Sequence, residues 1–272
     1  MKRLNLMTNL VLCAIVILVS IFMVFSDVKD SSKKQSKNET LITEKKDDIK
    51  KDQKDSNIKS DKQAIKENTT KEENEKRIES FSMDNSLFIG DSRTVGLMEY
   101  SQMNEVDYFC TVGMSVFNIY DDSINVPHIG KVSLCDLLEK RKYDRVYLML
   151  GVNEMGYKFE KIIEKYKELI QLIKEKEPYA TIFLQANLHV TSVRSNSDNT
   201  FNNKSINRLN TALSKLANNK DIFYLDVNPL FDDENGNLSA DKSSDNTHLY
   251  AKYYKDWGQW IIEQTALLTK GE

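Results

Sequence analysis

The sequence is poor in the residues that build disulfide frameworks and metal sites, with three cysteines and three histidines among 272 residues. Three cysteines are too few for a disulfide framework, and Cys13 lies inside an apolar N-terminal run. Cys110 and Cys135 remain as the one possible pair. Cys110 falls in a predicted core strand, where a buried thiol is favoured over a disulfide. No metal-ligand cluster and no glycine-rich phosphate loop occurs in the sequence, so no cofactor and no metal are expected.

An excess of basic charge is also missing. The chain carries 38 Lys and Arg against 41 Asp and Glu, which gives a formal net charge of -3. Binding of nucleic acid depends on a basic surface that neutralises phosphates. The balance therefore argues against a nucleic-acid partner.

Apolar residues are scarce in one long segment, residues 27–80. From Asp27 to Glu79 the sequence contains no aromatic residue, no glycine and no proline, and it is dominated by Lys, Glu, Asp, Asn and Ser. Such a composition cannot bury enough apolar surface to offset the entropy lost on ordering. We therefore expect a disordered, charged linker that acts as a tether, with local helix possible where charges of opposite sign recur.

Residues 1–26 are different, because they contain a long apolar run. Lys2 and Arg3 precede Leu4 to Phe25, a length that matches the roughly 20 residues a helix needs to cross a membrane. A cleaved signal peptide is the alternative, since the uninterrupted core Leu10 to Val19 also suits its apolar region. We expect an uncleaved single-pass anchor in the cell membrane. The basic pair places its start in the cytoplasm and the rest of the chain outside.

The remaining residues, 81–272, alternate strand and helix patterns. Short apolar runs rich in Val, Ile, Phe and Tyr predict five strands, at residues 87–89, 108–112, 145–150, 181–185 and 222–225. Helices are predicted at residues 94–100, 133–140, 160–177, 203–216 and 250–268. Alternating strands and helices indicate an α/β fold with a mostly parallel five-stranded sheet covered on both faces, a three-layer α/β/α sandwich. Functional residues are then expected in loops at the carboxyl ends of the strands.

The first candidate site residue follows the first of these strands. Gly90-Asp91-Ser92 joins an apolar strand to a helix, so Ser92 stands at a helix N-terminus, where backbone N–H groups and the helix dipole favour a developing negative charge. This placement suits a nucleophile. The simpler interpretation is that Asp91 and Ser92 only cap the helix.

The second candidate is His248, which lies three residues after Asp245 and just before the last helix. A carboxylate at that spacing can accept the imidazole N–H and leave the other ring nitrogen free as a base. Asp245 could alternatively serve only as a helix cap. The other two histidines, His128 and His189, are predicted to be surface or substrate-side residues and not the base.

Two further segments follow strands. Gly151-Val152-Asn153 places an amide side chain where it could donate a hydrogen bond to an oxyanion, although Gly and Asn are also common in plain turns. Gly113 follows the second strand, where a glycine permits close approach of a backbone N–H to substrate. Neither segment is specific by itself.

Taken together, Gly-Asp-Ser, then Gly113, then Gly-x-Asn and finally Asp-x-x-His occur in an order that resembles the SGNH hydrolases, the GDSL-like lipase/acylhydrolase family. The resemblance extends from Asn85 to Leu268, about two thirds of the chain. It implies a flavodoxin-like fold, with Ser92 as nucleophile, His248 as base and Asp245 as orienting acid. It also implies an oxyanion hole formed by Ser92, Gly113 and Asn153.

Two positions depart from the family pattern. Glu154 stands where many members have Asp, and Arg93 stands where the longer Gly-Asp-Ser-Leu form has Leu. Neither position provides a catalytic atom, so both concern the subfamily and its substrate.

The resemblance predicts a serine esterase that acts through an acyl-enzyme. From the expected location we favour deacetylation of an extracellular or cell-wall carbohydrate, with the Thr191 to Asn203 loop and the loop around His128 beside the site. Acyl transfer to a glycan is the alternative within the enzyme class. A catalytically idle domain that binds wall polymers is the alternative outside it.

Overall fold

The computed structural model describes residues 70–269. Contacts divide the chain into two units, and every strand and helix named below belongs to the second, Lys71–Glu272. The expected membrane anchor at residues 1–26 and residues 27–69 of the expected linker lie outside the described part. Residues 70–80, the end of the segment expected to be a disordered linker, are helical. Within residues 70–269, no helix combines the length and the apolar character that crossing a bilayer requires.

A five-stranded parallel sheet forms the centre of the fold, with the strand order β2-β1-β5-β6-β7. The strands are β1 (Ser86–Gly90), β2 (Asp107–Cys110), β5 (Arg145–Met149), β6 (Thr181–Gln185) and β7 (Ile222–Leu225). Each coincides with one of the five predicted apolar runs. The parallel arrangement and the number of strands are as predicted, because strands buried on both faces contain near-continuous apolar residues.

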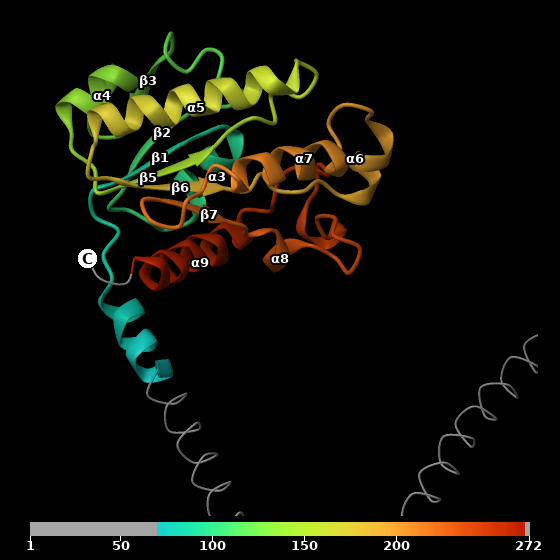
Figure 1. Ribbon diagram of the computed structural model, residues 1–272. Helices are drawn as coiled ribbons and strands as arrows, with labels where there is room; N and C mark the ends of the chain where they lie inside the picture. Colours follow the sequence, from blue (N-terminus) through green and yellow to red (C-terminus); the bar gives the residue numbers. More distant parts are fainter. Residues whose placement is uncertain (1–69, 270–272) are drawn as a thin grey trace, which may run out of the picture. The chain divides into compact units, whose positions relative to one another are not determined.

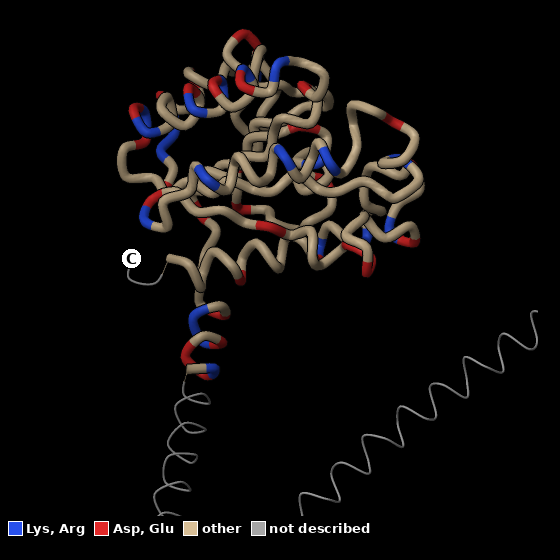
Figure 2. The backbone as a smooth tube through the Cα atoms, turned by 45° about the vertical axis from the view of Figure 1, so that its right-hand side comes forward, with Lys and Arg blue, Asp and Glu red and all other residues tan. Residues whose placement is uncertain are grey.

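Helices cover both faces of the sheet, which gives the predicted three layers (Figure 1). One face packs against α4 (Leu134–Lys140), α5 (Phe159–Lys176) and α7 (Asn203–Ser214). The other face packs against α3 (Ser92–Tyr100), α8 (Asn228–Phe231) and α9 (Lys252–Leu268). Figure 2 shows Lys, Arg, Asp and Glu recurring along α5, whose buried residues are Ile162, Tyr166, Leu169, Ile170 and Ile173.

A row of aromatic side chains crosses the sheet on the face that packs against α9. Each strand contributes one ring at the same register: Tyr108, Phe88, Tyr147, Phe183 and Phe223. Centroids of neighbouring rings lie 4.3 to 5.7 Å apart, within the range of favourable aromatic pairs. The row links all five strands near the middle of their lengths.

Helices α3 and α9 pack closely against each other. Their contact depends on Gly96, because a Cβ added there would lie 2.3 Å from the Tyr254 ring. The contact matters for the site, since Ser92 is the first residue of α3 and His248 precedes α9 by a few residues.

Several features of the chain differ from the sequence-based prediction, among them the short helix α8, which was not predicted. Residues 123–133 form a small antiparallel hairpin outside the main sheet, β3 (Ser123–Val126) with β4 (Gly130–Ser133). The expected loop from Thr191 to Asn203 contains a short helix, α6 (Ser192–Ser197). A 3-10 helix, Ala240–Lys242, interrupts the segment before Asp245.

Candidate active site

Ser92 lies where β1 passes into α3, at the carboxyl edge of the sheet. The turn is tight, because a side chain at Gly90 would place a Cβ 1.9 Å from Thr94 Oγ1 and 2.8 Å from the Met149 carbonyl oxygen. Only glycine fits there. Asp91 caps the helix by accepting a hydrogen bond from the Arg93 backbone N–H at 3.0 Å, so capping and presentation of Ser92 occur together.

The structure brings Ser92, His248 and Asp245 into one hydrogen-bonded chain. Ser92 Oγ lies 2.9 Å from His248 Nε2, and His248 Nδ1 lies 2.7 Å from Asp245 Oδ2. An ionised carboxylate only accepts hydrogen bonds, so Nδ1 carries the proton and donates it to Asp245. His248 Nε2 is then the acceptor for the Ser92 hydroxyl.

Asp245 is held in place by several donors. Its Oδ1 accepts backbone N–H groups of Thr247 at 2.9 Å and of His248 at 2.7 Å, and the Ser243 hydroxyl at 3.2 Å. Partial burial raises the pKa of Asp245, but these N–H groups and the His248 ring outweigh burial and hold that pKa below its usual range. The carboxylate is therefore charged over the whole range in which an imidazole titrates.

A second pair of hydrogen bonds orients the turn that carries His248. Asn246, inside this turn, adopts a left-handed backbone conformation with φ 66°. Thr191 donates its hydroxyl to Asn246 Oδ1 at 2.8 Å, and its backbone N–H donates to the Asn246 carbonyl at 3.1 Å. Sequence reasoning did not identify Thr191 for this role, because no local pattern connects it to a residue 55 positions later.

Gly113 and Asn153 belong to loops on either side of Ser92, since β2 and β5 flank β1 in the sheet. Gly113 occupies a turn closed by the Met114 N–H and the Thr111 carbonyl at 3.1 Å, and its φ of 78° favours glycine. No atom lies within 4 Å of a Cβ added there, so a side chain would have room at this position, and glycine is favoured only by the backbone conformation. Asn153 Nδ2 donates to the Met114 carbonyl at 2.9 Å, which uses one of its two N–H bonds.

Glu154 ties these two loops together. It is buried, and its Oε1 accepts the backbone N–H of Val116 in a short hydrogen bond. Burial raises the pKa of Glu154. The hydrogen bonds from Val116 and Ser115 lower it, but burial is the larger effect and the net pKa is raised. The sequence marked Glu154 only as a departure from a family pattern, whereas the structure makes it the link between the Gly113 and Asn153 loops.

Arg93, the other departure, lies buried beside Asp91. The two side chains are 2% and 0% exposed, and Arg93 Nη1 lies 3.6 Å from Asp91 Oδ2. Burial raises the pKa of Asp91, and Arg93 opposes that shift. Arg93 also lies over the ring of Phe201 at 5.8 Å. A leucine could not form this ion pair below the start of α3.

The two other histidines lie elsewhere. His189 was expected at the surface or beside substrate, but it is buried and bonded through Nδ1 to Asp232 at 2.8 Å and through Nε2 to Asn207 at 2.9 Å. Burial lowers the pKa of His189, and the hydrogen bonds to Asp232 and Asn207 reverse that shift, so the net pKa is raised. His128 occupies the turn of the β3–β4 hairpin with φ 62°.

The two described cysteines, Cys110 and Cys135, are both free thiols. Burial raises the pKa of Cys110 to about 12, as expected of a core thiol. Among residues 70–269, no group of three or more His, Cys, Asp and Glu side chains is placed to hold a metal ion.

The arrangement can perform acyl chemistry. A hydroxyl, an imidazole and a carboxylate are aligned for proton transfer, and the loops that carry Gly113 and Asn153 leave the sheet at the same edge as Ser92. The site is open, because the side chains of His248 and Asp245 are 37% and 52% exposed and Val112 is 74% exposed.

Residues 120–255, half of the chain, match the family model of the GDSL-like lipase/acylhydrolase family. The match includes Asn153, Asp245 and His248, while Ser92 and Gly113 precede it. No curated protein matches the chain.

Solved structures share the fold. A protein from Streptococcus pneumoniae named as a platelet activating factor has a TM-score of 0.52 and 20% identity, and the similarity covers 76% of this chain and 99% of that one. A GDSL-like lipase from Bacteroides thetaiotaomicron has a TM-score of 0.51 and 15% identity, covering 67% and 87%. At such low identity these likenesses establish the architecture alone.

Proposed function

Because the chain belongs to the GDSL-like lipase/acylhydrolase family of hydrolases, we propose that it is a serine esterase with Ser92 as nucleophile, His248 as base and Asp245 as orienting acid. The observation that carries this proposal is the continuous pair of hydrogen bonds, 2.9 and 2.7 Å long, from Ser92 Oγ through His248 to Asp245. A domain that only bound ligand would have no need of this alignment.

In the first half of the reaction, His248 Nε2 takes the proton of the Ser92 hydroxyl as Oγ attacks the ester carbonyl carbon. The carbonyl oxygen becomes an oxyanion, stabilised by the backbone N–H groups of Ser92 and Gly113 and by the Asn153 amide. The C–O bond to the alcohol then breaks, and the leaving oxygen takes the proton from His248. Ser92 is left acylated.

In the second half, His248 takes a proton from water as the water oxygen attacks the acyl carbon. The Ser92 Oγ–carbon bond breaks, the proton returns to Oγ, and a carboxylic acid leaves. Transfer of the acyl group to another alcohol would require water to be kept away from the acyl-enzyme. The exposure of His248 and Asp245 favours hydrolysis over that alternative.

For the substrate, we propose an acylated carbohydrate outside the cell membrane. The location rests on the apolar N-terminal run at residues 1–26 and on the basic pair before it. An open site suits a small acyl group on a bulky polar molecule better than a long buried acyl chain. We propose that polar residues of the Thr191 to Asn203 segment bind sugar hydroxyls, because this segment is hydrogen-bonded to the turn that carries His248.

The test is hydrolysis of p-nitrophenyl acetate by the full chain and its variants. Ser92→Ala should reduce kcat to near background, because the covalent route is lost. Asn153→Ala should reduce kcat by about 100- to 1000-fold, the usual cost of losing one oxyanion donor. Ser214→Ala on α7 is the matched control and should behave like the parent. Near-normal turnover by Ser92→Ala would refute the mechanism.

A further inference from the structure

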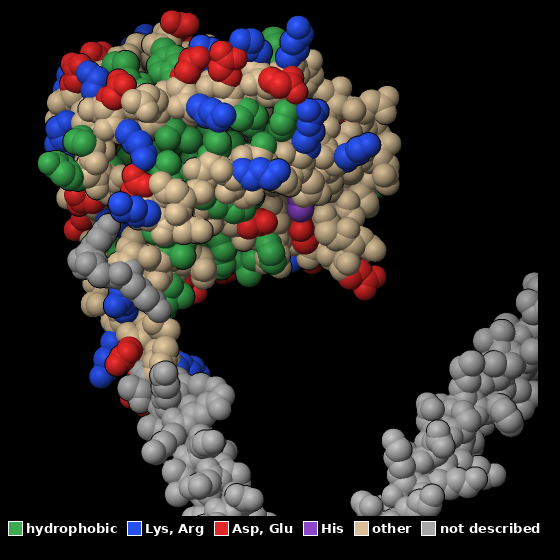
Figure 3. Space-filling model, viewed as in Figure 1, with side chains coloured by type: hydrophobic (Ala, Val, Ile, Leu, Met, Phe, Trp, Pro, Cys, Tyr) green, Lys and Arg blue, Asp and Glu red, His purple; other side chains and the backbone are tan. Residues whose placement is uncertain are grey.

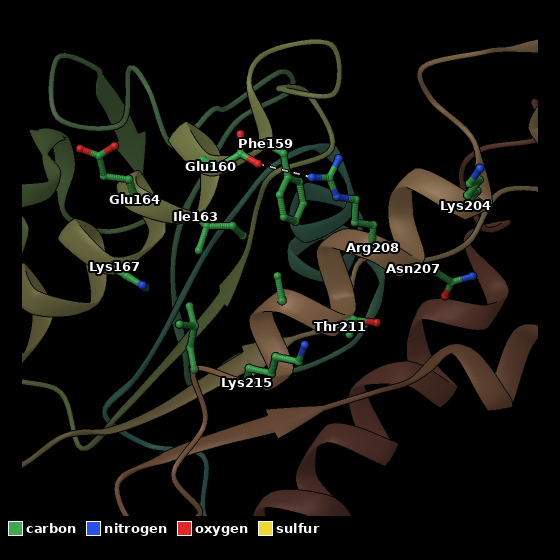
Figure 4. A pocket seen from close by; sticks show the side chains of 12 residues that line it. Phe159, Glu160, Ile163, Glu164, Lys167, Lys204, Asn207, Arg208, Thr211 and Lys215 are labelled. Atoms are coloured by element: carbon green, nitrogen blue, oxygen red, sulfur yellow. Dashed lines mark ion pairs between the residues drawn. The ribbon is translucent and has the colours of Figure 1, made fainter.

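A groove of about 930 Å³ lies between α5 and α7, on the sheet face opposite α3 and α9. Its floor is apolar and includes Phe159, Ile163 and Leu216. Figure 3 shows this face, with a patch of hydrophobic side chains crossed by Lys and Arg. The close-up in Figure 4 shows Lys167 and Lys215 towards one end of the groove and Lys204 towards the other.

The charges around this groove that lack an ion-pair partner are all positive. Both acidic residues of its lining are paired, Glu160 with Arg208 at 3.5 Å and Glu164 with Lys161 at 2.6 Å. The three lysines of the lining form no ion pair with any residue in the described part of the chain: Lys167, Lys204 and Lys215. The groove is thus a cationic feature on a chain whose net charge is -3.

The groove begins at the same edge of the sheet as the candidate active site. Helices α5 and α7 each follow a parallel strand, so both start at the carboxyl edge where Ser92 lies. A smaller cavity of about 210 Å³ borders the Asn153 loop through Gly151 and Met155, and it shares Phe159 and Arg208 with the groove. The Arg208 guanidinium stacks 3.8 Å from the Phe159 ring and forms the boundary between the two spaces.

We propose that this groove is a substrate subsite that holds an anionic glycan strand whose ester group lies at Ser92. The inference rests on the function proposed above and adds the charge class of the substrate. A polymer that is esterified at one sugar must continue along an adjacent surface. Sugar rings place C–H faces on the apolar floor, and their carboxylate or phosphate substituents lie near the lysines. An uncharged acyl tail would use the floor alone.

Binding by the full-length Ser92→Ala protein tests the subsite separately from turnover. We expect polygalacturonate or phosphomannan to bind, and the neutral dextran and mannan to bind at least about 10-fold more weakly. Replacing the three lysines together (Lys167→Gln, Lys204→Gln, Lys215→Gln) should weaken binding of the anionic polymer by about 10-fold, because each exposed charge contact contributes modestly. Binding should also weaken as salt is raised.

Lys220→Gln is the matched control, because Lys220 is an exposed lysine that does not line the groove. In otherwise unmodified enzyme, the triple variant should lose at least about 10-fold more activity on an acetylated anionic glycan than on p-nitrophenyl acetate. Comparison of polygalacturonate with phosphomannan tells whether carboxylates or phosphates are preferred.

Three results would overturn the proposal. Equal binding of anionic and neutral polymers, or an effect of Lys220→Gln as large as that of the triple variant, would remove the charge selectivity while leaving the esterase intact. Parent-like binding by the triple variant would exclude the groove as the binding surface. Absence of p-nitrophenyl acetate hydrolysis by the parent would instead refute the esterase, and with it the substrate role of the groove.

Discussion

Glu154 illustrates how one buried side chain can set the geometry of two loops. It follows Asn153 directly and accepts the Val116 N–H from the segment after Gly113. Glu154→Ala would leave that buried N–H without a partner, which typically costs about 1–3 kcal/mol. We expect the free energy of unfolding to fall by that amount and kcat to fall about 10-fold, with a smaller change in KM.

Glu154→Gln is the matched variant, because Gln keeps the accepting oxygen and removes the charge. The free energy of unfolding in urea and kcat on p-nitrophenyl acetate should both be close to the parent's values. The reason is that burial already raises the pKa of Glu154 and disfavours its charge. An equal loss in Gln and Ala would show that the negative charge matters and that the loop contact does not.

Asp245 provides a pH-dependent prediction. Its pKa is lower in the folded chain than the ordinary value of about 3.9, so its contribution to stability is present above that pH and declines as pH falls below about 4. The difference in Tm between the parent and Asp245→Asn should therefore be largest above about pH 5 and shrink in stronger acid. Asp256→Asn, an exposed change on α9, should shift Tm little at any pH. A difference in Tm that does not vary with pH would contradict the assignment.

At the scale of elements, the α3–α9 contact is open to a double-mutant test. Gly96→Ala should improve the intrinsic helix propensity of α3 by about 1 kcal/mol, yet its Cβ would overlap the Tyr254 ring. We expect a net loss of stability of about 1–3 kcal/mol, together with lower kcat, because this contact sets the separation of Ser92 and His248. Unfolding in urea and ester kinetics measure both.

In a Tyr254→Leu background, Gly96→Ala should lower the free energy of unfolding by less than it does in the parent, because the ring that its Cβ overlaps is gone. If the two substitutions proved additive, the ring contact would not be the source of the effect.

The elements differ in how well sequence patterns predict them. The five strands were predictable because each contains a short run of buried apolar side chains, and α5 because its aliphatic residues repeat at three and four positions. The β3–β4 hairpin was not, since of its eight residues only Val126 and Val132 are buried and no periodicity distinguishes them. Helix α6 was also missed, because Ser192–Ser197 buries no side chain.

The candidate site was predictable to the extent that it follows topology. Ser92, Gly113 and Asn153 come after strands β1, β2 and β5, and parallel strands place such loops at one edge. Contacts that depend on tertiary packing cannot be recognised from a pattern of neighbouring residues in the sequence. The Glu154–Val116 bond, the Thr191–Asn246 pair and the buried Asp91–Arg93 pair therefore became visible only in the folded chain.

At the scale of the whole molecule, the candidate catalytic groups come from opposite ends of the described chain. Ser92 and His248 are separated by 156 positions, and α9, which packs against α3, follows His248. During synthesis the ribosome would therefore release nearly the entire domain before the hydroxyl met its base. An emerging chain would stay unreactive towards esters while it is being translated, and reactivity would appear only with the completed domain.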